Sequence, residues 1–133
     1  MVEWQVRGIR GATTVTENTV AAMSDAVHEL IAEIEAHNLF RPEDIVCVFF
    51  TVTTDLDAMF PAAAARNRPG WENVPLIDIQ QMHVKGSLER CIRVLIQVNT
   101  SVLQSAIVHR YLREAQALRP DLDVQLTTSN STN

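Results

Sequence analysis

Residues 91–98 read C-I-R-V-L-I-Q-V, and this stretch decides the fold. Its alternation is that of a β-strand, in which successive side chains point to opposite faces of a sheet. One face carries only β-branched residues: Ile92, Val94, Ile96 and Val98. The other face carries Cys91, Arg93, Leu95 and Gln97. The stretch therefore predicts a strand with its β-branched residues on one face and an arginine on the other.

Three further segments are expected to form strands beside it. Residues 4–9 alternate loosely and lead into an expected loop at 10–16. Residues 45–53 are almost continuously apolar and β-rich, which is typical of a central strand covered on both faces. Residues 74–80 predict another strand. Pro75 restricts it to a sheet edge or to the first residues of the strand, because proline cannot donate to a β-ladder.

Two segments have helical character. Residues 18–38 place apolar side chains at spacings of three and four, which predicts a helix that lies on the sheet. These apolar residues are Val20, Met23, Val27, Leu30, Ile31 and Ile34. Thr16 or Asn18 can cap the start of this helix. The alanine-rich residues 60–66 predict a short second helix, opened by Pro61.

Counting these elements gives an α+β fold, with a mixed sheet of about five strands, one long helix and one short helix. Local propensity slightly favours helix at residues 105–118 and does not decide that segment. The helices can cover only one face of the sheet, so we expect an oligomer to cover the other. Residues 1–126 are expected to form a single domain, and the polar residues 127–133 a disordered tail.

Composition argues against several functional classes. The net charge of −5 argues against nucleic acid as a partner. No apolar run is long enough to cross a membrane, and residues 1–7 lack the apolar region of a signal peptide, so a cytoplasmic location is expected. The four histidines and two cysteines are scattered without ligand spacing, so neither a metal nor another cofactor is expected.

Arginine dominates the basic residues, since Lys85 is the only lysine among eleven. A guanidinium can hold a carboxylate through two parallel hydrogen bonds. Arg93 is the most informative case, because a guanidinium within an apolar strand is costly to bury without a partner. It could form a buried ion pair with an acidic side chain, or it could bind a ligand at the edge of a cleft. The strand alone leaves both interpretations open.

The stretch R-G-I-R-G-A-T-T at residues 7–14 contains further candidates. Gly8 and Gly11 would permit a sharp turn or a close approach to a ligand. The spacing matches no nucleotide-binding loop, and a strand end with solvated arginines is the simpler interpretation. Tyr111, the only tyrosine, could donate to an anion or pack at a rim.

Five segments together resemble one enzyme family. They are R-G-I-R-G-A-T-T at 7–14, D-L-D-A-x-F-P at 55–61, G-W-x-x-V-P at 70–75, C-I-R-V at 91–94, and H-x-Y-L followed by L-R-P-D-L between 109 and 122. Their order and spacing are similar to those of the AroH-class chorismate mutases. The resemblance implies a homotrimer with a pseudo-α/β-barrel of sheets inside, helices outside and active sites at the subunit interfaces. It also implies that residues 109–118 are largely extended.

The resemblance implies an isomerase of aromatic amino acid biosynthesis that rearranges chorismate to prephenate without a cofactor. It would place Arg93 at the ether oxygen of the breaking bond, with Arg10 and Tyr111 on substrate carboxylate. The remaining wall and rim positions would be Phe60, Leu118 and, as a source of long-range positive charge, Arg66. The alternative function is a non-catalytic trimeric module that binds an anionic metabolite through the same arginines.

The sequence departs from the family pattern at one point. Gln81 stands where the family has a glutamate that meets the substrate hydroxyl, and Asp78 stands three positions earlier in place of a small residue. The two have opposite parity in a straight strand, so the strand must end or bulge near Gln80 if both line the site. We predict that Asp78 supplies the carboxylate and that Gln81 only orients the substrate. With Arg93, these two complete the predicted catalytic set.

Overall fold

The computed structural model describes residues 3–121, so positions 122–126 of the predicted domain and the predicted tail lie outside it. The strands are β1 (Gln5–Thr14), β2 (Ile45–Val52), β3 (Leu76–Gln80), β4 (Cys91–Thr100) and β5 (Arg110–Tyr111). The helices are α1 (Val20–His37) and α2 (Pro61–Arg66), and the 3-10 turns are η1 (Pro42–Asp44), η2 (Gln104–Ala106) and η3 (Arg113–Leu118). Within the described residues, this is the predicted α+β fold with one long and one short helix.

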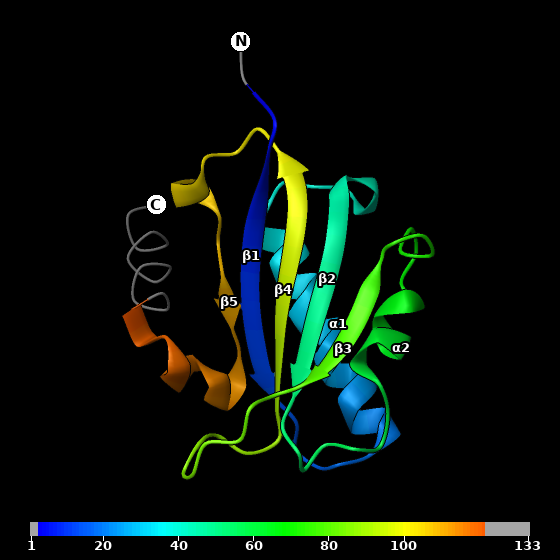
Figure 1. Cartoon of the computed structure of the whole chain (residues 1–133), viewed down its shortest axis with the longest axis vertical. Helices are drawn as coiled ribbons and strands as arrows, with labels where there is room; N and C mark the ends of the chain where they lie inside the picture. Colours follow the sequence, from blue (N-terminus) through cyan, green and yellow to red (C-terminus); the bar gives the residue numbers. More distant parts are fainter. Residues whose placement is uncertain (1–2, 122–133) are drawn as a thin grey trace.

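The strands form a single mixed sheet in the order β3-β2-β4-β1-β5 (Figure 1). The central strand β4 pairs antiparallel with β1 and β2. The outer pairs, β2 with β3 and β1 with β5, are parallel. Pro75 immediately precedes the edge strand β3, which confirms the predicted restriction on that segment.

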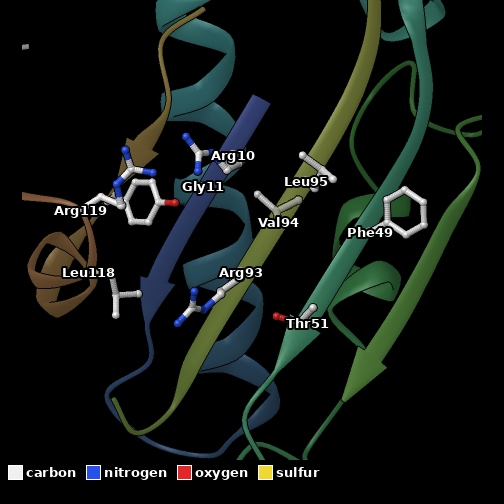
Figure 2. Close-up of a pocket in the computed structure, with 10 residues that line it drawn as sticks. Arg10, Gly11, Phe49, Thr51, Arg93, Val94, Leu95, Leu118 and Arg119 are labelled. Atoms are coloured by element: carbon white, nitrogen blue, oxygen red, sulfur yellow. The ribbon is translucent and has the colours of Figure 1, made fainter. Parts of the chain in front are cut away.

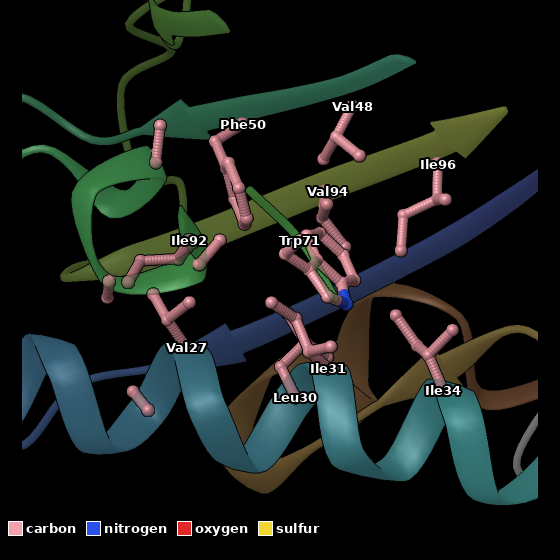
Figure 3. Close-up of a cluster of buried hydrophobic side chains, with 14 of the residues drawn as sticks. Val27, Leu30, Ile31, Ile34, Val48, Phe50, Trp71, Ile92, Val94 and Ile96 are labelled. Atoms are coloured by element: carbon pink, nitrogen blue, oxygen red, sulfur yellow. The ribbon is translucent and has the colours of Figure 1, made fainter. Parts of the chain in front are cut away.

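Helix α1 lies across one face of the sheet, and the hydrophobic core fills the space between them (Figure 3). The helix contributes Val27, Leu30, Ile31 and Ile34, and β4 contributes Ile92, Val94, Ile96 and Val98. These eight side chains are at most 4% exposed. Full burial of one such side chain stabilises the fold by roughly 1.5–3 kcal/mol. The predicted alternation of β4 is confirmed, and the face with Ile92, Val94, Ile96 and Val98 is its core face.

The first strand is longer than predicted, and the loop expected at residues 10–16 is wrong. β1 continues to Thr14 and pairs with β4 along its whole length. Gly11 makes no turn there. A Cβ at Gly11 would lie 2.9 Å from Ile34 Cδ1 and 3.1 Å from Leu30 Cδ1, so the glycine is what allows α1 to pack closely on the strand.

The predicted cap of the long helix is also wrong. Thr19 caps α1, and its hydroxyl accepts the backbone N–H of Ala22 at 3.1 Å. Thr16 lies before the cap, and Asn18 has a different partner. The Asn18 side chain donates to Asp57 Oδ1 and accepts the Asp57 backbone N–H, so it ties the loop after β2 to the start of α1.

The segment at residues 109–118 is only partly extended, against the expectation from the family resemblance. Arg110–Tyr111 forms β5, and η3 follows directly. The chain turns at Arg113, whose φ is +53°. Its guanidinium donates to the Thr14 carbonyl at 2.8 Å and pairs with Glu29 of α1, and these contacts hold the turn against the body of the protein.

The sheet face opposite α1, called the open face below, is not covered within residues 3–121 (Figure 1). It carries Phe49 and Thr51 of β2, Ile77 and Ile79 of β3, and Arg93 and Leu95 of β4. Ile77 is 52% exposed and Ile79 is 43% exposed. A single chain thus does not supply the second cover expected for residues 45–53. None of the helices in the described residues is long and apolar enough to cross a membrane.

Candidate active site

A pocket of about 580 Å³ opens on the open face, and we call it the open-face pocket (Figure 2). Strands β1, β2 and β4 form its floor, and the segment from β5 to the end of η3 forms one wall. Its lining residues are Arg10, Gly11, Phe49, Thr51, Arg93, Val94, Leu95, Tyr111, Leu118 and Arg119. Four of the predicted site residues, Arg10, Arg93, Tyr111 and Leu118, therefore meet in one cavity.

Arg93 projects from the middle of the sheet into this pocket. It is half-buried, and its Nε is buried without a hydrogen-bond partner. Among residues 3–121 it forms no ion pair with a carboxylate. Cys91, on the same side of β4, does not neutralise it, because burial raises the pKa of the Cys91 thiol. Of the two interpretations open at the start, the internal ion pair is therefore excluded within the described chain.

Most other arginines of the described chain bind a carboxylate or a backbone carbonyl, unlike Arg93. Six of them pair with carboxylates of the described chain: Arg41, Arg68, Arg90, Arg110, Arg113 and Arg119. Arg7 donates to the Val102 carbonyl. The three arginines whose guanidinium binds neither a carboxylate nor a backbone carbonyl within residues 3–121 are Arg10, Arg66 and Arg93. These are the three arginines that the family resemblance assigns to the substrate. Arg93 hydrogen-bonds the Cys91 thiol, and its Nε has no partner.

Tyr111 and Leu118 occupy the wall of the open-face pocket. Tyr111 is 9% exposed and lies opposite Ala12 in the β1–β5 pair. Leu118 is half-buried at the end of η3 and packs against the small cluster around Tyr111. Because β5 is only two residues long, the position of this wall depends on its contacts with β1.

Among the lining residues that sequence reasoning did not assign to the site, two have polar side chains, Thr51 and Arg119. Thr51 is the cross-strand neighbour of Arg93, and its Oγ1 is buried without a partner. It could have been found from the parity of residues 45–53, once their pairing with β4 was known. Arg119 directly follows Leu118 in the L-R-P-D-L segment, and its guanidinium binds the Asp121 carboxylate at 3.0 and 3.1 Å.

Asp78 lies on the other side of the sheet, in a second pocket of about 570 Å³ that we call the Asp78 pocket. It is paired in register with Phe50, a fully buried core residue, so its side chain points toward the helices. Asp78 Oδ1 accepts the backbone N–H of Ala62 at 3.0 Å, at the start of α2. Burial raises the pKa of Asp78, opposed by that hydrogen bond and by the charge of Arg66.

Phe60 and Arg66 belong to this second region. Phe60 immediately precedes α2, lines the Asp78 pocket and is 71% exposed. Arg66 is the exposed last residue of α2. Within one chain, Asp78 and Arg93 thus lie on opposite faces of the sheet and do not meet.

Gln81 lies just beyond the end of β3. The strand ends at Gln80, as the parity argument required, and the Gln81 backbone N–H donates to the Val52 carbonyl at 2.8 Å. Its side-chain Oε1 is buried without a partner. Gln81, Thr51 and Arg93 thus each leave a buried polar atom unpartnered, which is costly unless another molecule binds it. No group of three or more His, Cys, Asp or Glu side chains in the described residues could hold a metal ion.

A family model, chorismate mutase type I, matches residues 6–122. The chain belongs to the chorismate mutase type I family. The protein is therefore a chorismate mutase, an isomerase of aromatic amino acid biosynthesis, and chorismate is its substrate.

Named relatives are similar along nearly their whole length. Chorismate mutase AroH from Bacillus subtilis (strain 168) is 43% identical over 123 residues, which are 92% of this chain and 97% of that protein. Chorismate mutase AroH from Thermus thermophilus is 49% identical over 119 residues, or 89% and 97%. The solved structure of a chorismate mutase from Clostridium thermocellum superposes with a TM-score of 0.80 at 44% identity and covers 83% of this chain and 97% of that one.

Proposed function

We propose that this chorismate mutase rearranges chorismate to prephenate, without a cofactor, in active sites that two neighbouring chains of a homotrimer build together. The observation that carries the proposal is Arg93, a half-buried cation in an open pocket with no carboxylate partner among residues 3–121. A buried guanidinium requires an anion or a strong acceptor. A dianionic substrate with an ether oxygen supplies both.

Assembly follows from the distribution of the site residues over the two sides of the sheet. The open-face pocket holds Arg10 and Arg93, whereas the Asp78 pocket holds Asp78 and Phe60. In a trimer, the open-face pocket of one chain can face the Asp78 pocket of the next. The exposed isoleucines of β3 support this arrangement, because apolar side chains of an uncovered sheet are typical of subunit contacts.

The chemistry suits a site made of fixed cations. The [3,3] rearrangement breaks one C–O bond and forms one C–C bond within a single molecule, so it requires no nucleophile and no proton transfer. The protein can accelerate it by holding the compact conformer in which the reacting carbons are close. It can also place fixed positive charge at the ether oxygen, where negative charge grows in the transition state.

In this site, the Arg93 guanidinium would donate to the ether oxygen and to one substrate carboxylate. Arg10 and Tyr111 would hold substrate carboxylate from the facing strands. The apolar walls would be Leu118 of one chain and Phe60 of the next, with Arg66 as a rim charge. The wall residues restrict the conformers available to the substrate, and the arginines select the one with its ether oxygen near Arg93.

The carboxylate expected in this family would come from Asp78. Asp78 is half-buried and already oriented by the Ala62 backbone N–H, so little conformational entropy is lost when it meets the substrate. It would offset the positive charge that develops on the ring fragment. Gln81, with its unpartnered Oε1, would orient the substrate hydroxyl.

The decisive experiment incubates the purified protein with chorismate and follows the loss of its absorbance, with prephenate identified as the product. We expect turnover that survives a chelator, and Arg93→Ala serves as the inactive control. Binding of chorismate without turnover would instead support the non-catalytic module. Activity abolished by chelator and restored by a divalent ion would contradict the cofactor-free mechanism.

The trimer has its own test. We expect Ile79→Asp to dissociate the assembly, because a charge buried without a partner at a subunit contact costs several kcal/mol. Val20→Asp is the matched control, since Val20 is 56% exposed on α1, on the helix side of the sheet. Light scattering measures the oligomeric state, and the activity is followed on dilution. A fully active wild-type monomer would refute the shared site.

A further inference from the structure

His109 makes a contact that the reaction itself does not require. Its Nδ1 accepts the backbone N–H of Arg10 at 2.9 Å. His109 lies just before β5, whose pairing with β1 covers only two residue pairs, Gly11 with Arg110 and Ala12 with Tyr111. The histidine extends this short connection by one further bond, at the junction between the Arg10 strand and the Tyr111 wall.

The contact fixes the protonation state of the ring. A backbone N–H can only donate, so Nδ1 must be unprotonated, and the proton of the neutral imidazole is on Nε2. The imidazolium carries a proton on both nitrogens and has no acceptor to offer. Proton uptake by His109 therefore breaks the bond to Arg10.

The charged groups around His109 oppose proton uptake. Burial lowers the pKa of His109, and the positive charges of Arg10 on β1 and Arg119 after η3 lower it further. The acidic groups of the neighbouring elements already have cationic partners, because Glu33 of α1 binds Arg110 and Asp121 binds Arg119. The pKa of His109 is thus lower than that of an ordinary histidine, and the bond is intact at neutral pH.

We propose that His109 is a positioning residue for substrate capture, which holds Arg10 in place when neutral and releases it when protonated. This inference rests on the proposed role of Arg10 in binding substrate carboxylate. Loss of the bond loosens the β1–β5 junction beside Arg10, whose backbone stays paired with β4 opposite Leu95. The Arg10 side chain and the Tyr111 wall must then be ordered again each time substrate binds. Arg93 is on β4 and keeps its place, so the effect falls on KM and leaves kcat nearly constant.

The experiment is a pH profile of kcat and KM for the full-length protein, from about pH 8 to about pH 5, where histidine titrates. For the wild type we expect KM to rise about 2- to 10-fold on acidification, the equivalent of one ordinary hydrogen bond. His109→Phe keeps a ring but has no acceptor, so its KM is raised at every pH and no longer responds to acid. His109→Asn keeps an acceptor that does not titrate, so it rescues most of that loss and also has a flat profile.

Two controls separate this effect from others. Asp78→Asn removes the half-buried carboxyl of the proposed site, and it must leave the acid-dependent rise in KM in place. The imidazole NMR spectrum of the wild type must show the Nε2–H tautomer at neutral pH and a titration that coincides with the change in KM.

The contradicting outcomes are equally specific. A wild-type rise in KM that persists in His109→Asn would assign the titration to another group. A KM that falls on acidification would show that the added charge attracts the dianion more than the lost bond weakens it, and would overturn the proposal. A wild type without turnover would overturn the proposed function instead, and the imidazole spectrum would still decide the contact.

Discussion

The two faces of the sheet are built from neighbouring residues of the same strands. They differ in how far a single chain buries their apolar side chains and provides partners for their polar atoms. On the covered face, Ile92 and Ile96 are fully buried against α1. On the open face, Arg93 has an unpartnered Nε, and the β3 isoleucines are exposed. Packing within one chain buries the apolar side chains of the first face. The second face is explained only when a ligand and a neighbouring chain are added.

Among substitutions on the two faces, we expect those of Arg93 to have the largest effect on activity. Arg93→Ala should lower kcat by at least the 10²- to 10³-fold that follows loss of one preorganised donor, with a smaller effect on substrate binding. Arg93→Lys should rescue little, because a point charge cannot reproduce the planar fork. Steady-state kinetics give kcat and KM, and thermal unfolding checks that both variants fold. Near-normal kcat in either variant would remove Arg93 from the proposed mechanism.

A substitution on the covered face should lower stability and leave kcat almost unchanged, the opposite of what we expect for Arg93. Ile96→Ala leaves a cavity beside α1 and should cost about 2–5 kcal/mol of unfolding free energy. Its kcat, measured on folded enzyme well below the melting temperature, should change little, since Ile96 points away from the open-face pocket. Denaturant unfolding and kinetics on the same samples test both halves. A loss of kcat without a loss of stability would show that the two faces are not separable.

These faces also explain what could be predicted from the sequence. The strand at residues 91–98 and its alternation were predictable because alternation is a local signal. The strand at Arg10–Thr14 was missed because Gly11 and Ala12 have weak β-propensity and because the strand is ordered by distant partners, β4 and β5. Likewise, the turn at Arg113 depends on Thr14 and Glu29, far away in the sequence.

The site residues could be predicted only through the family resemblance, which indicates the positions in this sequence that correspond to the family's site. Placement of Arg10, Arg93, Tyr111 and Leu118 in one pocket agrees with that resemblance. The residue pattern alone could not do this, because the four come from three strands and a turn. Their roles, and those of Phe60, Arg66, Asp78 and Gln81, remain predictions. Thr51 was missed because a threonine in a β-rich segment looks like an ordinary strand residue.

Asp78 and Gln81 allow a finer comparison, since one lies on each side of the point where β3 ends. Asp78→Asn should cost roughly 2–4 kcal/mol of transition-state stabilisation, as loss of a preorganised electrostatic partner does. Gln81→Ala should cost about 0.5–1.5 kcal/mol, the contribution of a neutral hydrogen bond. Kinetics of the two single variants decide the roles. A harmless Asp78→Asn beside a crippled Gln81→Ala would reverse them.

Asp78→Asn should also change how the unfolding free energy depends on pH, and the sign of that change can be worked out. The raised pKa of Asp78 means that the folded chain binds more protons than the unfolded chain between the ordinary aspartate pKa and the raised value. Its contribution to stability is therefore present at acid pH and is lost as the pH rises through that window. Asp78→Asn should remove this pH dependence without destabilising the fold at neutral pH, which denaturant unfolding at several pH values would measure.

The smallest expected effect is at Thr51, where the same substitution can be made on both faces. Thr51→Val keeps the shape of the side chain and removes a hydroxyl whose oxygen has no partner. If this hydroxyl meets the substrate, kcat/KM should fall by the equivalent of about 0.5–1.5 kcal/mol, while stability is unchanged or rises because no unsatisfied group remains buried. Thr51→Ser, which keeps the hydroxyl, should retain most of the activity.

The matched control is Thr13→Val on the covered face, where Thr13 is fully buried opposite Ile92 and its hydroxyl donates to the Thr14 carbonyl at 3.4 Å. Thr13→Val loses only this long hydrogen bond, so its kcat/KM should match the wild type. A Thr51→Val enzyme that gains stability and keeps full kcat/KM would make the hydroxyl irrelevant to catalysis. Among the described residues that line the open-face pocket, Arg93 would then be the one with an unpartnered polar atom left to bind the substrate, since Gln81 lies outside this lining.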